Sequence, residues 1–228
     1  MDEKKHKAKK KNTFDVETSI KAAVNLMFTQ MQATLGFKLF GYRAVAAMIN
    51  EFKRLEEVLM PGKKAVTAIN PETLSAEEKE KLLNAVNIIK QKRDGTIRCR
   101  TCADGSKQKR YLGKYESVAS PTVSLESLFT TLVIDSYEER DIATFGIPGA
   151  YLHAKIPADK NVILKLRGHF VDIMCEINEE YRQYIRYEQG KKFLYFKVLR
   201  AIYGCIESAL QWYNLYTQTL KAEGYILN

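Results

Sequence analysis

The sequence predicts an α+β fold in which a helical N-terminal region precedes a region of mixed helices and strands. Three observations support this prediction. Apolar residues recur at spacings of three and four up to about residue 93, which is the helical period. The pair Asp94-Gly95 then interrupts that pattern, and short extended segments around a polar turn follow. From about residue 120 helices and strands alternate, as in an α+β domain.

Composition and charge limit the kinds of partner that the chain can have. It has 228 residues, 46% of them hydrophobic and 28% charged, so it is long enough to bury a sizeable core. Lys and Arg number 36 against 27 Asp and Glu, a formal net charge of +9. Residues 1–12 carry six of the lysines, and we expect them to form a disordered basic tail. This balance favours polyanionic partners, nucleic acid above all.

The cysteines and the hydropathy pattern predict a cytoplasmic location. The four cysteines are too few and too scattered for a disulfide framework, so we expect a reducing environment. No run approaches the roughly 18 apolar residues that span a bilayer, and the N-terminus lacks the apolar core of a signal peptide. We therefore expect no membrane partner. The lysine run KKHKAKKK leaves nuclear import as an alternative.

Cys99 and Cys102 form a C-x-x-C pair, which is a pattern found in zinc sites. Structural zinc needs four ligands, and the remaining cysteines and histidines stand far away in the sequence. A redox C-x-x-C pair would begin a helix, whereas this pair falls in a predicted hairpin. We therefore expect no metal site at these cysteines.

The residues from 13 to 93 are predicted to form three helices. The first runs from about Thr13 to Gly36, where the glycine is expected to end it. Its apolar face comprises Ala22, Ala23, Leu26, Met27, Gln30, Met31 and Thr34. The second runs from about Tyr42 to Leu59 and is followed by Pro61-Gly62. The third begins with a capping box of Ser75 and Glu78. It is expected to continue through Leu82, Leu83, Val86 and Ile89 until Asp94-Gly95.

The residues from 94 to 228 are predicted to contain a hairpin, two helices and several strands. The hairpin joins Ile97–Cys102 to Lys109–Leu112 through the turn Asp104-Gly105-Ser106. A helix follows Ser120-Pro121, with Ser124 as its N-cap. The last helix spans about Ser208–Ala222, with Gly224 placed for a C-cap. The expected strands are 141–147, 162–166, 193–198 and a segment beginning at Tyr225.

Two motifs in this second region resemble the palm of copia-type retrotransposon reverse transcriptases. The segment Gly146-Ile-Pro-Gly-Ala-Tyr-Leu152 resembles the family pattern D-V-K-T-A-F-L, and Ile202-Tyr-Gly-Cys-Ile-Glu-Ser-Ala-Leu-Gln-Trp212 resembles L-Y-G-L-K-Q-A-P-R-A-W. The segment Arg98–Gly105 resembles the basic fingers segment, and Ser120–Leu125 resembles the start of the helix that follows it. The resemblance covers Asp94 to Asn228 in family order. It implies a partial fingers and palm domain with an N-terminal helical extension.

The resemblance implies a lost activity. The family performs RNA-directed DNA polymerisation on an RNA template and a DNA primer, with deoxynucleotides and two magnesium ions held by palm carboxylates. Gly146 occupies the position of the first catalytic aspartate and offers no carboxylate. The family's second aspartate motif is not found before Asn228. We therefore expect a protein of this sequence to be catalytically inactive and to hold no cofactor, unless the remainder of a polyprotein supplies the missing carboxylates.

The resemblance also assigns nucleotide-binding positions. Arg98 and Arg100 would donate to the triphosphate, and Ile147 would offer a backbone carbonyl to the metal. Tyr151 corresponds to the aromatic residue beneath the sugar. The complete set is Arg98, Arg100, Ile147, Tyr151, Tyr203 and Gly204, of which the last two would lie against the nucleotide and template. Without the resemblance, Gly146 with Pro148-Gly149 is a strand end and turn, the arginines are solvated, and the tyrosines are packing residues.

Three hypotheses follow. The first is an inactive copia-type reverse-transcriptase fragment; the second is a non-catalytic nucleic-acid-binding module; the third is a retroelement relic without function. The resemblance carries a geometric expectation as well. Gly146 should end a central strand, at the floor of a concave surface bordered by the Arg98–Arg100 strand and the Tyr203-Gly204 turn.

Overall fold

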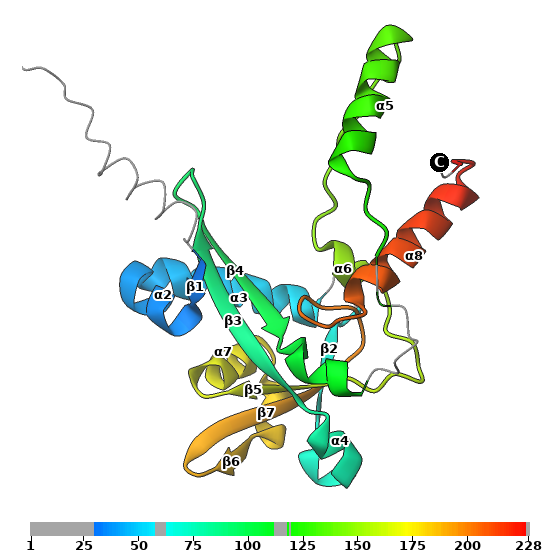
Figure 1. The fold of residues 1–228 in the computed structure, drawn as a ribbon. Coiled ribbons are helices and arrows are strands. Elements are labelled where there is room, and N and C mark those ends of the chain that lie inside the picture. The colour runs from blue at the N-terminus through cyan, green and yellow to red at the C-terminus, as the bar shows by residue number, and fades with distance from the viewer. Residues whose placement is uncertain (1–29, 58–62, 112–117, 119, 227–228) are drawn as a thin grey trace, which may run out of the picture.

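A seven-stranded mixed sheet forms the centre of the molecule (Figure 1). The computed structural model describes residues 30–57, 63–111, 118 and 120–226. The strands are β1 Gln30–Gln32, β2 Val66–Ile69, β3 Leu83–Gln91, β4 Ile97–Ala103, β5 Ile163–Arg167, β6 Arg186–Glu188 and β7 Lys191–Val198. Their order is β1-β3-β5-β7-β2, with β4 paired to β3 and β6 paired to β7. The β3–β5 pair is parallel, and the other strand pairs are antiparallel.

Helices pack on this sheet or project from it. The α-helices are α2 Ala33–Phe40, α3 Tyr42–Glu56, α4 Ala76–Glu80, α5 Leu125–Tyr137, α6 Ala150–His153, α7 His169–Ile177 and α8 Ser208–Ala222. The 3-10 helices are η1 Pro71–Thr73, η2 Gly105–Arg110 and η3 Glu179–Tyr184. Helix α3 contacts α2, α7, β2 and β4. Figure 1 shows α5 and α8 extending away from the sheet. Within the described residues, no helix is long and apolar enough to cross a bilayer.

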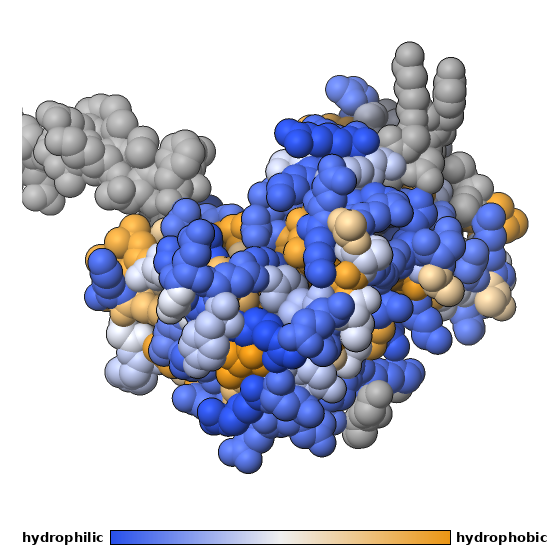
Figure 2. Space-filling view, turned by 90° about the horizontal axis from the view of Figure 1, so that it is seen from below, coloured by the Kyte–Doolittle hydropathy of each residue, from blue (hydrophilic) through white to orange (hydrophobic). Residues whose placement is uncertain are grey.

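The core lies between the sheet and the helices α3 and α7. Met48 and Phe52 on α3 are fully buried, as are Leu83, Ile89 and Leu194 on the strands. These large side chains stabilise the fold because each removes its apolar surface from water. The view from below in Figure 2 shows a mainly hydrophilic face on which hydrophobic residues form small, scattered patches.

Several predicted elements are confirmed. Helix α3 begins at Tyr42, and the residues after Glu57 that were predicted to continue it lie outside the described part. Ser75 and Glu78 form both hydrogen bonds of the capping box, at 3.1 and 2.8 Å. Ser124 caps α5 by accepting from the Ser127 amide at 3.1 Å. The strands predicted at 162–166 and 193–198 are β5 and β7.

Helix α8 has the bounds that the sequence predicted, and Gly224 ends it. Gly224 has a φ of +88°, in the left-handed region. Its amide donates to the Lys221 carbonyl, and the Tyr225 amide donates to the Leu220 carbonyl. These two bonds form a Schellman motif, which satisfies carbonyls that the helix end leaves free. The predicted strand beginning at Tyr225 is wrong for Tyr225 and Ile226, which have no strand structure, while Leu227 lies outside the described residues.

The predicted third helix is wrong beyond its first turns. Helix α4 ends at Glu80, Leu82 has no regular structure, and Leu83, Val86 and Ile89 belong to β3. Strand β3 pairs with β4 over seven residues, from Ala85↔Ala103 to Gln91↔Ile97. Asp94-Gly95 is therefore the turn of this hairpin, and Gly95 adopts a φ of +79° there. The predicted turn Asp104-Gly105-Ser106 instead begins η2, where the Asp104 carboxylate accepts from the Ser106 amide.

Two further element predictions are wrong. Gly36 does not end a helix; it lies inside α2, where it allows α2 to approach Ile89, which a Cβ at this position would meet at 2.7 Å. Of the residues predicted to precede it in the same helix, 13–29 lie outside the described part, and Gln30–Gln32 form β1. Residues 141–147 were predicted as a strand but have no regular secondary structure. Their first six residues are exposed, and they pair with none of the strands in the described part of the chain.

Candidate functional site

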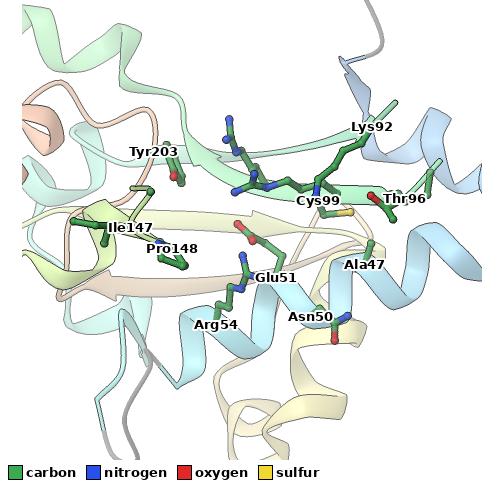
Figure 3. Close-up of a pocket in the computed structure, with 15 residues that line it drawn as sticks. Ala47, Asn50, Glu51, Arg54, Lys92, Thr96, Cys99, Ile147, Pro148 and Tyr203 are labelled. Atoms are coloured by element: carbon green, nitrogen blue, oxygen red, sulfur yellow. The ribbon is translucent and has the colours of Figure 1, made fainter. Parts of the chain in front are cut away.

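A cavity of about 660 Å³ opens between α3, β4 and the loop that precedes α6. Each wall contributes polar groups: Asn50, Glu51 and Arg54 come from α3, and Arg98 and Arg100 come from β4. Figure 3 shows Glu51 and Arg54 rising from α3 toward β4, with Ile147 and Pro148 at one end of the cavity. We call this cavity the cationic cleft, because arginines line both of its long walls.

The cationic cleft brings together five of the sequence-predicted residues. They are Arg98, Arg100, Gly146, Ile147 and Tyr203. They reach the cleft from three segments that are far apart in the sequence: β4, the loop before α6 and the turn after β7. Local sequence could not produce this arrangement; it depends on the β3–β4 hairpin and α3 packing together.

Gly146 lies on the open side of the cleft. It belongs to an irregular loop and not to the end of a central strand, which corrects the expectation for its backbone. The residue is exposed, and a Cβ added to it would meet no atom within 4 Å. A side chain is therefore sterically possible at this position, and the glycine is not required by close packing.

Arg100 and two tyrosines are in contact at one end of the cleft. The Arg100 guanidinium lies 4.9 Å from the centre of the Tyr203 ring, a cation–π distance. The Tyr151 and Tyr203 ring centroids are 4.9 Å apart, with planes at 46°. Tyr151 is on α6 and supports Tyr203 without lining the cleft itself. The Arg100 Nε is buried without a hydrogen-bond partner. A buried donor of this kind costs free energy unless a partner satisfies it.

Gly204 contacts β4 and does not line the cleft. Its φ is +89°, and a Cβ here would lie 2.0 Å from the Ala103 carbonyl oxygen. The neighbouring Tyr203 carbonyl accepts from the Ala103 amide at 2.7 Å. Gly204 therefore lets the turn after β7 lie directly against the end of β4, which positions Tyr203 beside Arg100.

Glu51 is one of the polar cleft residues that were not predicted from the sequence, together with Asn50, Arg54 and Lys92. Its Oε1 accepts from the Thr101 amide of β4 at 3.1 Å. Burial raises the pKa of the Glu51 carboxyl, while the Thr101 hydrogen bond and the attraction of Arg54, Arg98 and Arg100 oppose that rise. The spacing of Glu51 and Arg54 places both on one face of a helix. That signal was present in the sequence, but it does not reveal which strand the face meets.

The cleft does not fit a magnesium ion. Magnesium requires several oxygen ligands, and carboxylates supply most of its protein contacts. Gly146 supplies no carboxylate, and Glu51 shares the cleft with Arg54, Arg98 and Arg100, whose charges oppose a divalent cation. Within the part of the chain that the structure describes, no three His, Cys, Asp or Glu side chains are grouped as metal ligands.

The C-x-x-C pair lies on β4, and its two cysteines differ in environment. Cys99 is buried, and its Sγ lies 3.7 Å from the Ala44 carbonyl oxygen of α3. Burial raises the pKa of the Cys99 thiol to about 12. Burial also raises the pKa of the Cys102 thiol. Burial therefore disfavours the thiolate form of both cysteines.

Comparison of the chain with protein-family models, with curated proteins and with solved structures gives no match. The geometry of the cleft and the motifs of the sequence are therefore the basis for a functional assignment.

Proposed function

We propose that this chain is a copia-type reverse-transcriptase-like domain whose cationic cleft binds the phosphates of nucleotides or nucleic acid without polymerising DNA. One observation carries the proposal. Arg98 and Arg100 line the same cavity as Gly146, Ile147 and Tyr203, and these residues come from the three motifs that resemble the fingers and palm.

The chemistry of the cleft suits a phosphate ligand. Arginine guanidinium groups donate charge-assisted hydrogen bonds to phosphate oxygens, often in pairs. The unpartnered Arg100 Nε is a donor whose burial a ligand oxygen would compensate. Tyr203 presents an aromatic ring on which a base or sugar can pack, and Arg100 fixes one side of that ring. These features support phosphate binding and require no metal.

The same cleft lacks what polymerisation requires. Gly146 replaces the carboxylate that would neutralise charge as the phosphoryl group is transferred. A single preorganised electrostatic group contributes about 3–4 kcal/mol to a transition state, so its loss alone lowers the rate by two to three orders of magnitude. The remaining cleft residues bind and orient phosphates and carry no second metal ligand set.

Primer extension tests the catalytic part of the proposal. We expect no nucleotide incorporation on a primed homopolymer RNA template with either magnesium or manganese. The variant Gly146→Asp has room for its side chain, but it should remain inactive in this chain because one carboxylate cannot hold two ions. Incorporation by the wild-type protein above a heat-inactivated control would contradict the proposal.

Nucleotide binding tests the other part. A fluorescent deoxynucleoside triphosphate should bind the wild-type protein, and Arg100→Gln should weaken binding by about tenfold through loss of charge-assisted bonds. Lys197→Gln is the matched control because it removes one exposed positive charge that does not line the cleft. Equal binding by Arg100→Gln and the control would show that the ligand does not occupy the cleft.

The basic hairpin favours a second candidate, a non-catalytic nucleic-acid-binding module. Gln30, Lys90 and Arg98 are aligned across β1, β3 and β4, so their side chains share one face of the sheet. All three are exposed. Single-stranded nucleic acid should then bind with a salt dependence of about −0.9 per neutralised phosphate on duplex and somewhat less on single strands. A shift that persists after Lys90→Gln and Arg98→Gln, but is lost on deleting residues 1–12, would assign the binding to the basic tail instead.

A further inference from the structure

The cationic cleft contains one negative charge among its positive ones. Four cationic side chains line it: Arg54, Lys92, Arg98 and Arg100. Glu51 is the one carboxylate among the described residues that line the same cavity. Glu51 lies in the middle of α3 and points toward β4 (Figure 3), within electrostatic reach of Arg54, Arg98 and Arg100. A phosphate that binds these arginines must therefore come close to Glu51.

Glu51 is held in this position by the main chain of the opposite wall. The hydrogen bond from the Thr101 amide fixes one carboxylate oxygen against β4. The Glu51 side chain is half-buried, whereas Arg54 and Arg98 are exposed and can move toward a ligand. The arginines can follow an incoming anion, but the carboxylate stays between them. A bound anion gains attraction from the cations and loses part of it to repulsion from Glu51.

We infer that Glu51 weakens anion binding in the cleft, and that this penalty grows with the charge of the anion. The inference rests on the proposed function and names a residue that sets how steeply affinity rises with ligand charge. Repulsion between Glu51 and a ligand grows with the charge of the ligand. At an effective dielectric constant of about 20, repulsion between the Glu51 charge and one ligand charge several ångströms away lowers the ligand's affinity by roughly tenfold or more. A phosphodiester carries one such charge near Glu51, and a triphosphate carries three or four.

A series of anions tests this inference. Dissociation constants for orthophosphate, pyrophosphate and tripolyphosphate are measured by titration calorimetry at pH 7.5 and constant ionic strength. The variant Glu51→Gln keeps an oxygen that can accept from the Thr101 amide while it removes the charge. We expect Glu51→Gln to tighten binding by about tenfold for orthophosphate and by a larger factor for tripolyphosphate.

Two further variants separate the position of the charge from the net charge. Glu57→Gln removes an exposed carboxylate at the end of the same helix, outside the cleft, and should change each affinity by less than about twofold. Asn50→Asp places a second carboxylate on the same wall at an exposed position. It should weaken tripolyphosphate binding more than orthophosphate binding, and it tests the charge effect even if Glu51→Gln does not fold.

Each outcome separates this inference from the proposed function. A gain that increases from orthophosphate to tripolyphosphate in Glu51→Gln alone supports the inference. An equal gain for all three anions, or an equal gain in Glu57→Gln, overturns it and leaves phosphate binding in place. If no anion binds to the wild-type protein or to any variant, the proposed function is wrong, and the inference about Glu51 is overturned with it.

Discussion

Helices α3 and α5 both carry large apolar residues, and these residues reach opposite environments. Met48 and Phe52 on α3 are 0% and 1% exposed, because α3 packs against α7 and the sheet. Phe129 and Val133 on α5 are 62% and 69% exposed, and no residue of α5 is buried. Both helices form because their local sequence favours a helix. Only α3 has a partner surface in the described part of the chain.

This difference shows what an apolar face contributes by itself. An isolated helix of 13 residues is marginally stable in water, so α5 depends on its Ser124 cap and on its helix-forming residues. Helix α3 gains far more, since each buried side chain contributes about 1.5–3 kcal/mol. The apolar residues of α5 remain an exposed hydrophobic surface of the kind that marks an interaction site, and nothing in the structure shows what covers it.

The largest expected effect compares one phenylalanine from each helix. Phe52→Ala should lower the free energy of unfolding by about 3–5 kcal/mol, because it leaves a cavity in the core. Phe129→Ala should change it by less than about 0.5 kcal/mol, because its ring is already in water. Urea denaturation followed by circular dichroism measures both. Similar losses in the two variants would mean that α5 packs against the body in solution.

A second comparison uses two glycines. Gly204→Ala should destabilise the protein by about 1–3 kcal/mol or more, because its φ is positive and its Cβ would meet the Ala103 backbone. Gly146→Ala, in the loop after α5, should be neutral or slightly stabilising, since its Cβ would meet no atom and alanine restricts the unfolded chain. Thermal unfolding of the two variants distinguishes these outcomes. A stable Gly204→Ala protein would contradict the close contact between the turn and β4.

A third comparison uses pH. Burial raises the folded-state pKa of Glu51, so its contribution to stability is complete below the unfolded pKa near 4.5 and is lost as pH rises through the raised value. The stability of the wild-type protein relative to Glu51→Gln should therefore fall as pH rises from about 4.5 through the raised pKa of Glu51. Hydrogen bonds from the helix start lower the pKa of Glu126 on α5, so Glu126→Gln should show a weaker trend of the opposite sign. Denaturation midpoints at several pH values test both trends.

The smallest global effect is expected from the α5 cap. Ser124→Ala removes the acceptor for the Ser127 amide and should weaken the helix locally by about 1 kcal/mol. The unfolding midpoint of the whole protein should not move, because the core does not depend on α5. Hydrogen exchange would reveal faster exchange limited to residues 125–137. Faster exchange in α3 as well would show that the two helices are coupled.

The sequence predicted those elements whose signals are local. The capping box at Ser75, the cap at Ser124 and the glycine after α8 act within one turn of the chain, and all three are confirmed. Strand β3 was mistaken for a helix because Leu83, Val86 and Ile89 fit a helical spacing. Pairing with β4 makes this segment a strand, and the sequence of β3 alone does not reveal that partner.

In the candidate site, too, some features could be predicted from the sequence and others depend on tertiary packing. Arg98, Arg100, Gly146, Ile147 and Tyr203 were named through family motifs, and they share one cleft. The sequence could not give the irregular backbone at Gly146 or the support that Tyr151 gives to Tyr203, because both depend on how α6 meets the turn after β7. Glu51 was missed for a related reason. Its importance arises from the packing of α3 against β4, which brings together residues fifty positions apart.

The pairing of β3 with three other strands has a consequence for the order of synthesis. Strand β4 follows β3 after a short turn, so this hairpin can form as soon as both segments have left the ribosome. The parallel partner of Leu83 is Leu164 on β5, about eighty residues later. Until β5 is made, the start of β3 has an unpaired edge, and the nascent chain exposes it for several seconds at ordinary elongation rates of about 5–20 residues per second. The β3–β5 pair in the interior of the sheet therefore forms well after the β3–β4 hairpin, although β3 is among the first strands to be synthesised.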